Sequence, residues 1–202
     1  ECSATVVGFK PDGGIILDRT VFYATSGGQP GDHGVLTTKS GEVILIANAN
    51  FTHPDKPEIV HVPAEGAAAP LTVGEPLHAV VDWELRYARM RMHTALHLLS
   101  AILPYPVTGG SVGEAESRLD FDIPEAGLDK DAITQKLTKM IAADAEVRMR
   151  WITSAELEAN PSLVKTMSVK PPMGGGRVRL VEIVGYDLQP CGGTHVHRTS
   201  EI

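Results

Sequence analysis

The stretch His93-Thr94-Ala95-Leu96-His97 decides how this chain is interpreted, because it places two imidazoles four residues apart inside a predicted helix. Residues four apart lie on one face of a helix, so both rings can point at one site. The helix is predicted to run from Trp83 to about Ile102, with Asp82 as its N-cap and Pro104 just beyond its end.

A second pair with the same spacing follows near the end of the chain, in Cys191-Gly192-Gly193-Thr194-His195. The two glycines are expected to let the backbone turn so that thiolate and imidazole converge. Three imidazoles and one thiolate suit Zn²⁺ better than other common metals. We therefore predict one zinc ion per chain, bound by His93, His97, Cys191 and His195. The alternative is two buried helix histidines and a chance Cys-His pair.

The spacing alone leaves the role of this zinc open. In the familiar zinc-protease helix a glutamate follows the first histidine as general base, whereas here that position is Thr94. Four protein ligands normally make a closed, structural site, while a hydrolytic zinc keeps a position for water or substrate. His197 is either a bystander or a spare ligand.

The composition limits the classes of protein that fit. The 202 residues suffice for one large or two small domains. No apolar run approaches the ~20 residues that span a bilayer, so a membrane is not an expected partner. No secretory signal is visible, and two cysteines argue against a disulfide scaffold. A cytoplasmic protein is expected.

The net charge of −7 argues against broad, non-specific nucleic-acid binding, and DNA is not an expected partner. Two local basic tracks remain. No acidic residue occurs from 160 to 181, where Lys165, Lys170, Arg177 and Arg179 fall. A second cluster precedes the histidines and consists of Arg86, Arg89 and Arg91. Each track is either a local nucleic-acid contact or a solvated surface.

The distribution of apolar runs predicts an α+β chain of two domains, 1–82 and 83–202. Short apolar runs between glycine- and proline-rich turns predict a small antiparallel β-barrel. Its predicted strands cover 4–9, 14–17, 43–47, 59–62 and 77–81. The second domain mixes helices and strands without regular alternation. Its strands are predicted at 117–122, 147–151 and 178–184, with helices opening at Asp129 or Asp131 and at a capping box from Thr153 to Glu156.

Five motifs taken together resemble the alanyl-tRNA editing domain in its free-standing AlaX form. They are Asp18-Arg19-Thr20-Val21-Phe22-Tyr23, Ser26-Gly27-Gly28-Gln29-Pro30-Gly31-Asp32-His33-Gly34, His93-Thr94-Ala95-Leu96-His97-Leu98-Leu99, Arg118-Leu119-Asp120-Phe121-Asp122 and Pro190-Cys191-Gly192-Gly193-Thr194-His195. They span nearly the whole chain in the family's order. At Ile202 the chain stops where members of the family continue through further strands.

The resemblance implies a translation-factor-like barrel joined to a zinc-bearing α+β editing domain. It also implies a trans-editing hydrolase that deacylates tRNA(Ala) mischarged with serine, or with glycine, and that lacks the ATP-binding ligase domain of a synthetase. Two alternatives stay open: a non-catalytic zinc-stabilised tRNA-binding module, and a deacylase for another mischarged tRNA of the threonyl type. The segment Ser26–Gln29 together with Cys191–His195 favours the alanyl type.

Four residues are expected to act on the substrate. Backbone N–H groups of Gly27 and Gly28 are expected to approach the ester carbonyl or the terminal adenosine, because glycine leaves room. Thr20 is the candidate that senses the serine hydroxyl, since its own hydroxyl can donate and accept. Gln29 is the second candidate, with contact to the tRNA end or support of the turn as its other roles. The alternative for Thr20 is an ordinary strand residue.

Overall fold

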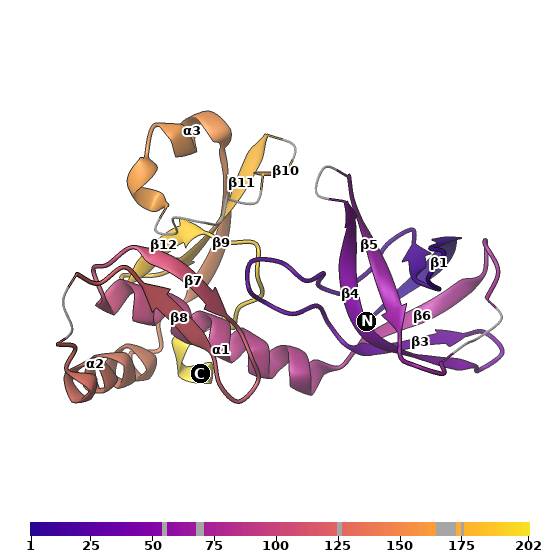
Figure 1. The fold of residues 1–202 in the computed structure, drawn as a ribbon, viewed down its shortest axis with the longest axis horizontal. Helices are drawn as coiled ribbons and strands as arrows, with labels where there is room; N and C mark the ends of the chain where they lie inside the picture. Colours follow the sequence, from indigo (N-terminus) through magenta and orange to yellow (C-terminus); the bar gives the residue numbers. More distant parts are fainter. Residues whose placement is uncertain (54–55, 68–70, 125–126, 165–172, 175) are drawn as a thin grey trace. The chain divides into compact units, whose positions relative to one another are not determined.

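A computed structural model describes residues 1–202 except 54–55, 68–70, 125–126, 165–172 and 175 (Figure 1). The chain folds into two compact units. The first comprises 1–26 and 30–86, and the second comprises 27–29 and 87–202. The expected combination of an antiparallel barrel with mixed helices and strands is confirmed.

The first unit is a closed barrel of six strands in the order β1-β2-β5-β4-β3-β6. The strands are β1 (Cys2–Phe9), β2 (Ile15–Leu17), β3 (Gly34–Thr38), β4 (Val43–His53), β5 (Lys56–Pro63) and β6 (Pro76–Val81). Antiparallel pairing of β1 with β6 closes the circle, which leaves no unpaired strand edge within the barrel.

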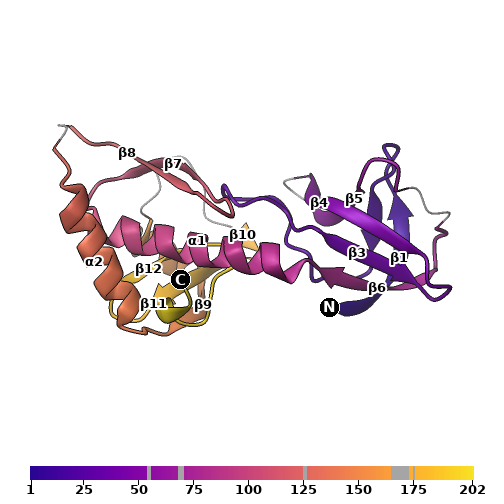
Figure 2. The same ribbon diagram turned by 90° about the horizontal axis from the view of Figure 1, so that it is seen from below.

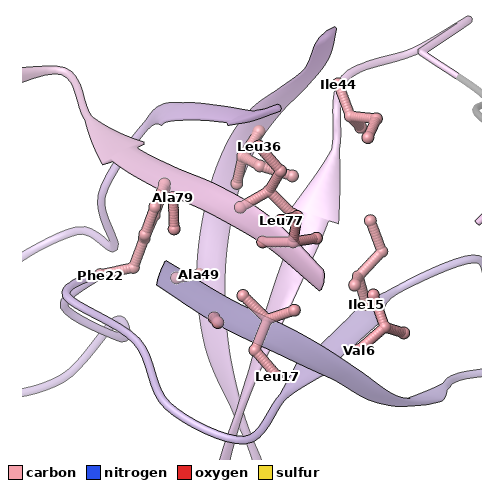
Figure 3. Close-up of a cluster of buried hydrophobic side chains, with 11 residues drawn as sticks. Val6, Ile15, Leu17, Phe22, Leu36, Ile44, Ala49, Leu77 and Ala79 are labelled. Atoms are coloured by element: carbon pink, nitrogen blue, oxygen red, sulfur yellow. The ribbon is translucent and has the colours of Figure 1, made fainter. Parts of the chain in front are cut away.

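Alternate residues of these strands point inward and fill the barrel (Figure 3). The interior includes Val6, Leu36, Ile44, Leu77 and Ala79, each at most 4% exposed. Neighbouring positions face outward, as Leu45 does at 54% exposed. The barrel is therefore held by one continuous apolar core.

The second unit is built on the helix α1 (Trp83–Ile102), whose predicted bounds are confirmed. Its other elements are β7 (Val107–Ser111), β8 (Arg118–Phe121), α2 (Lys130–Ala142), β9 (Val147–Thr153), α3 (Ser154–Glu158), β10 (Met173–Gly174), β11 (Arg177–Ile183) and β12 (Asp187–Pro190), with short 3₁₀ turns at Pro161–Leu163 and Thr199–Glu201. The predicted capping box at Thr153 and Glu156 is present.

The sheet of this unit places β11 between β9 and β12, and β10 also pairs with β11. One sheet face packs Val147, Val181 and Ile183 against Leu98 of α1, with partly buried residues of α2 joining them (Figure 2). The opposite face packs Val178 and Leu180 against Leu157 of α3. No helix in the described part of the chain is long and apolar enough to cross a membrane.

Replacing Leu36 by alanine is expected to destabilise the barrel by ~2–5 kcal/mol, because the fully buried side chain leaves a cavity. Leu45→Ala on the paired strand is the matched control and should change stability by less than about 1 kcal/mol. Urea unfolding followed by circular dichroism measures both variants. Equal effects would contradict the inward and outward assignment.

Candidate metal centre

The four residues expected to bind metal converge in the second unit. His93, His97, Cys191 and His195 each offer one ligand atom, and these atoms all lie within 4.8 Å of one another. The helix α1 presents both of its histidines on its buried face, beside Thr94 and Leu98. Cys191 is partly exposed while the three histidines are buried, so Cys191 is the most exposed of the four residues.

The distances within the cluster fit a tetrahedral metal. The Sγ atom of Cys191 lies 3.6 Å from His93 Nε2 and 3.4 Å from His195 Nε2. A zinc ion at its usual bond lengths would separate sulfur and nitrogen ligands by roughly 3.6 Å at the tetrahedral angle. The three imidazole centroids lie 4.4–5.2 Å apart. The residues present therefore fit a zinc ion in donor type and in spacing.

Hydrogen bonds fix the rings of both α1 histidines. His93 Nδ1 lies 2.9 Å from Gln29 Oε1, and the Thr194 backbone N–H donates to the same oxygen at 3.0 Å. This oxygen can only accept, so His93 carries its proton on Nδ1. His97 Nδ1 lies 3.1 Å from a carboxylate oxygen of Asp187, which likewise accepts. Both rings are thus left with Nε2 to bind a metal.

His195 is oriented in the same way through a hydroxyl. Its Nδ1 lies 3.1 Å from Thr94 Oγ1, and that hydroxyl donates its own hydrogen to the Met90 carbonyl at 2.9 Å. The Thr94 oxygen must therefore accept from His195 Nδ1–H. Thr94, which occupies the position of the general base in a zinc protease, thus orients the third histidine, His195.

The electrostatics of the cluster favour a thiolate. Burial, the largest influence, would raise the pKa of the Cys191 thiol, but charges on His93 and His97 and the close side-chain contact with His195 hold it well below its usual value. Burial and the same two histidine charges lower the pKa of His195 to about 3. Burial lowers the pKa of His97 too, but Cys191 and Asp187 raise it to about 9. Metal binding must therefore displace a proton from His97.

Gly193 lies at a bend of the chain without a left-handed backbone. Its lack of a side chain also leaves room for the neighbouring residues of the cluster. A side chain at Gly193 would overlap the His93 ring and lie 2.9 Å from Gln29 Oε1. The same residue donates its backbone N–H to Cys191 Sγ at 3.3 Å, which stabilises the thiolate.

The loop that carries Cys191 is held by Arg179, one of the residues expected to contact tRNA. Arg179 Nη1 donates to the carbonyl oxygens of Cys191 at 3.0 Å and Gly193 at 2.7 Å. Arg177, two residues earlier on β11, is exposed. Lys165 and Lys170 lie outside the described residues.

The glycines Gly27 and Gly28 have left-handed backbone conformations, with φ of 55° and 80°. A side chain at Gly28 would come within 2.7 Å of the Gly110 carbonyl oxygen. The Gly28 carbonyl accepts a hydrogen bond of 2.8 Å from Val112 N–H. The next residue, Gln29, is fully buried, and the contacts described above tie it to the metal ligands.

Thr20 belongs to the barrel unit, where its hydroxyl already has partners. Thr20 Oγ1 lies 2.7 Å from His61 Nε2 and accepts from Phe22 N–H at 3.0 Å. His61 Nδ1 donates to the Ile15 carbonyl at 3.1 Å. Burial lowers the pKa of His61, so its Nε2 is an unprotonated acceptor. The Thr20 hydroxyl therefore donates to His61 and keeps one lone pair.

The sequence leaves the cluster of Arg86, Arg89 and Arg91 as either a nucleic-acid contact or a solvated surface. Two of these three residues instead form ion pairs within the protein. Arg86 forms an ion pair with buried Asp32, with Nε 2.7 Å from the carboxylate. Arg89 is 3% exposed and donates to Glu114 at 2.8 Å. Arg89 is buried and Arg86 is partly buried, and both are held in ion pairs, whereas Arg91 is exposed.

Sequence analysis missed Asp187 and Gln189, two buried polar residues of β12. Gln189 donates to the Asp187 carboxylate at 2.8 Å, and the same carboxylate accepts from His97 Nδ1. Their spacing is the one sequence signal that could have revealed them. Residues two apart on a strand share a face, and Asp187 and Gln189 lie four and two residues before Cys191.

Family models match both ends of the chain. The model of "tRNA synthetases class II (A)" matches residues 4–85, and that of "Threonyl and Alanyl tRNA synthetase second additional domain" matches residues 178–202. The "Alanyl-tRNA editing protein AlaX-M" of Methanosarcina barkeri is 34% identical, covering 100% of this chain and 85% of that relative. The protein of the same name from Saccharolobus solfataricus is 31% identical, covering 93% of this chain and 79% of that relative. An "Alanine--tRNA ligase" of Solibacter usitatus is 36% identical over 93% of this chain but 22% of its own length.

Asp187→Ala is expected to weaken metal binding about 10- to 100-fold, since His97 loses the acceptor that fixes its ring. Competition with a chromophoric zinc chelator measures the affinity. Asp131→Ala removes an exposed carboxylate from α2 and is the matched control. Loss of affinity in both variants, or in neither, would contradict the role of Asp187.

Proposed function

The chain belongs to the AlaX family of alanyl-tRNA editing proteins, and we propose that it hydrolyses serine from mischarged tRNA(Ala). Glycine on the same tRNA is the second substrate that we propose. The ion proposed at the cluster is Zn²⁺, one per chain. The observation that carries the proposal is the convergence of His93, His97, Cys191 and His195, because these residues come from two of the motifs that this chain shares with the family.

Hydrolysis of an aminoacyl ester requires few contributions from protein side chains. Water must add to the ester carbonyl, the resulting oxyanion must be stabilised, and the ribose oxygen must leave with a proton. When bound, zinc supplies Lewis acidity for polarising a water or a carbonyl. Cys191 is the partly exposed member of the cluster, which suits a substrate that approaches it from solvent.

We assign the backbone of Gly27 and Gly28 to substrate binding. A side chain at Gly27 would meet nothing within 4 Å, so the backbone there borders open space. Its left-handed conformation favours glycine, and backbone N–H groups in such turns bind developing oxyanions. Gln29 acts behind this turn by orienting His93, which makes it a positioning residue in this account.

We assign tRNA backbone binding to the basic stretch of Lys165, Lys170, Arg177 and Arg179. Arg177 is exposed and suited to a phosphate, while Arg179 contributes by holding the Cys191 loop. Contacts of this kind weaken steeply as salt rises.

Thr20 is the residue that we propose for telling serine from alanine. Its hydroxyl donates to His61, so its remaining lone pair can accept a hydrogen bond from a serine side chain. Alanine lacks that donor. Sites built to hydrogen-bond a hydroxyl discriminate far more strongly than apolar pockets that sense one methylene.

A deacylation assay with a panel of charged tRNAs tests the activity. We expect hydrolysis of seryl-tRNA(Ala) and glycyl-tRNA(Ala), with alanyl-tRNA(Ala) largely spared, and loss of activity in the double variant Cys191→Ala, His195→Ala. Activity on a threonyl-type substrate alone would indicate a different deacylase. Rates equal to spontaneous hydrolysis on every substrate would favour a non-catalytic tRNA-binding module.

Thr20→Val is expected to reduce the preference for seryl- over alanyl-tRNA(Ala) by about tenfold or more. It also removes partners from His61 and from Phe22 N–H, so it is expected to lower stability by ~1–3 kcal/mol. Thr20→Ser keeps the hydroxyl and is the matched control. Unchanged discrimination by a folded Thr20→Val protein would move the sensor elsewhere.

A further inference from the structure

The sheet of the second unit has one face of mixed character. Side chains of a strand alternate between faces, and the antiparallel register pairs Trp151 with Arg179 and Met149 with Val181. Val181 pairs with Gln189 of β12. Arg179 and Cys191 each lie two residues from this pair, and the Cys191 N–H donates to the Arg179 carbonyl at 3.1 Å, so both residues are placed on the same sheet face. The open part of this face, here called the Trp151 face, comprises Met149, Trp151, Thr153, Arg177 and Arg179.

The Trp151 face is exposed where the rest of the same sheet face is buried. Val147, Val181 and Ile183 are at most 8% exposed beneath α1. Trp151 is 56% exposed and Met149 is 50% exposed. An exposed tryptophan next to an exposed methionine marks a binding surface more often than isolated apolar residues do.

Arg179 connects this face to the candidate metal centre. Its Nη1 donates to the carbonyls of Cys191 and Gly193, while its Nη2 lies 2.7 Å from Met149 Sδ. Cys191 is the partly exposed member of the four ligands. The Trp151 face therefore adjoins the loop that carries Cys191.

We propose that the Trp151 face binds the unpaired 3′-terminal base of an RNA, with the base stacked on the indole of Trp151. The proposal rests on the proposed function, which brings an aminoacylated RNA end to the metal ligands. Single-stranded nucleic acids are bound by aromatic platforms combined with cationic side chains. Arg177 supplies the cationic group beside the ring.

Charge distinguishes this occupant from a protein partner. None of the five residues of the Trp151 face is acidic. On the opposite sheet face, Arg148 and Arg150 form ion pairs with Glu146 and Glu182. The Trp151 face combines an exposed aromatic ring with the exposed guanidinium group of Arg177, which suits a polyanion that carries bases.

Steady-state deacylation of seryl-tRNA(Ala) tests the platform. Trp151→Ala is expected to raise KM about 5- to 100-fold, the usual range for one stacked base, with kcat nearly unchanged. Trp151→Phe retains a stacking ring and should stay within about threefold of the unmodified protein. Trp83→Ala is the matched control, because Trp83 is 59% exposed but lies in the barrel unit.

A binding measurement separates this inference from the catalytic proposal. The chain has two tryptophans, so Trp83→Phe leaves Trp151 as the sole indole. An acceptor-stem RNA hairpin that carries no amino acid but ends in the 3′-terminal adenosine is expected to quench the fluorescence of Trp151. The same hairpin without that adenosine is expected to leave the fluorescence unchanged.

Three results would overturn the platform. They are equal quenching by both hairpins, no quenching by either, and an unchanged KM for Trp151→Ala in an active enzyme. A change in oligomeric mass for Trp151→Ala, in place of a change in KM, would show that the face joins two copies of this chain. If no charged tRNA is hydrolysed, the proposed function fails while the fluorescence titration still decides the stacking.

Discussion

The metal centre depends on the position of three protons, one on the Nδ1 atom of each histidine. Each proton is donated to a fixed oxygen acceptor, and the three acceptors are Gln29, Asp187 and Thr94. The Nε2 atoms are consequently left unprotonated when the rings are neutral, and all three point toward Cys191. Without these acceptors the imidazoles would rotate and exchange tautomers, and the cluster would lose its common focus.

The cluster is buried, so its supports must be satisfied as well. In the described part of the chain, no buried side-chain nitrogen or oxygen lacks a hydrogen-bond partner. Asp187 accepts a hydrogen bond from Gln189, Gln29 donates one to the Thr194 hydroxyl, and Thr94 donates one to the Met90 carbonyl. Buried polar groups are costly when unpaired, so this network determines which residues the core of the second unit can contain.

Sequence reasoning succeeded where the pattern is local. The bounds of the helix α1 follow from its apolar spacing and from its N-cap, and the convergence of His93, His97, Cys191 and His195 follows from two four-residue spacings. It failed where function breaks the local pattern. The strand β12 begins at Asp187 and ends at Pro190, a composition atypical of strands, because its inward positions serve His97. The strand β3 was also missed, since Gly34–Thr38 directly follows a turn-rich motif. Only the tertiary structure reveals that Arg86 forms an ion pair with buried Asp32 and that buried Arg89 forms one with Glu114.

The central claim is that this constellation binds zinc through three imidazoles and one thiolate. X-ray absorption at the zinc edge, on protein purified without added metal, measures the ligands directly. The account predicts one sulfur at about 2.3 Å and three nitrogens at about 2.0–2.1 Å per zinc, with one zinc per chain. A shell of nitrogen and oxygen without sulfur, or the absence of stoichiometric metal, would contradict it.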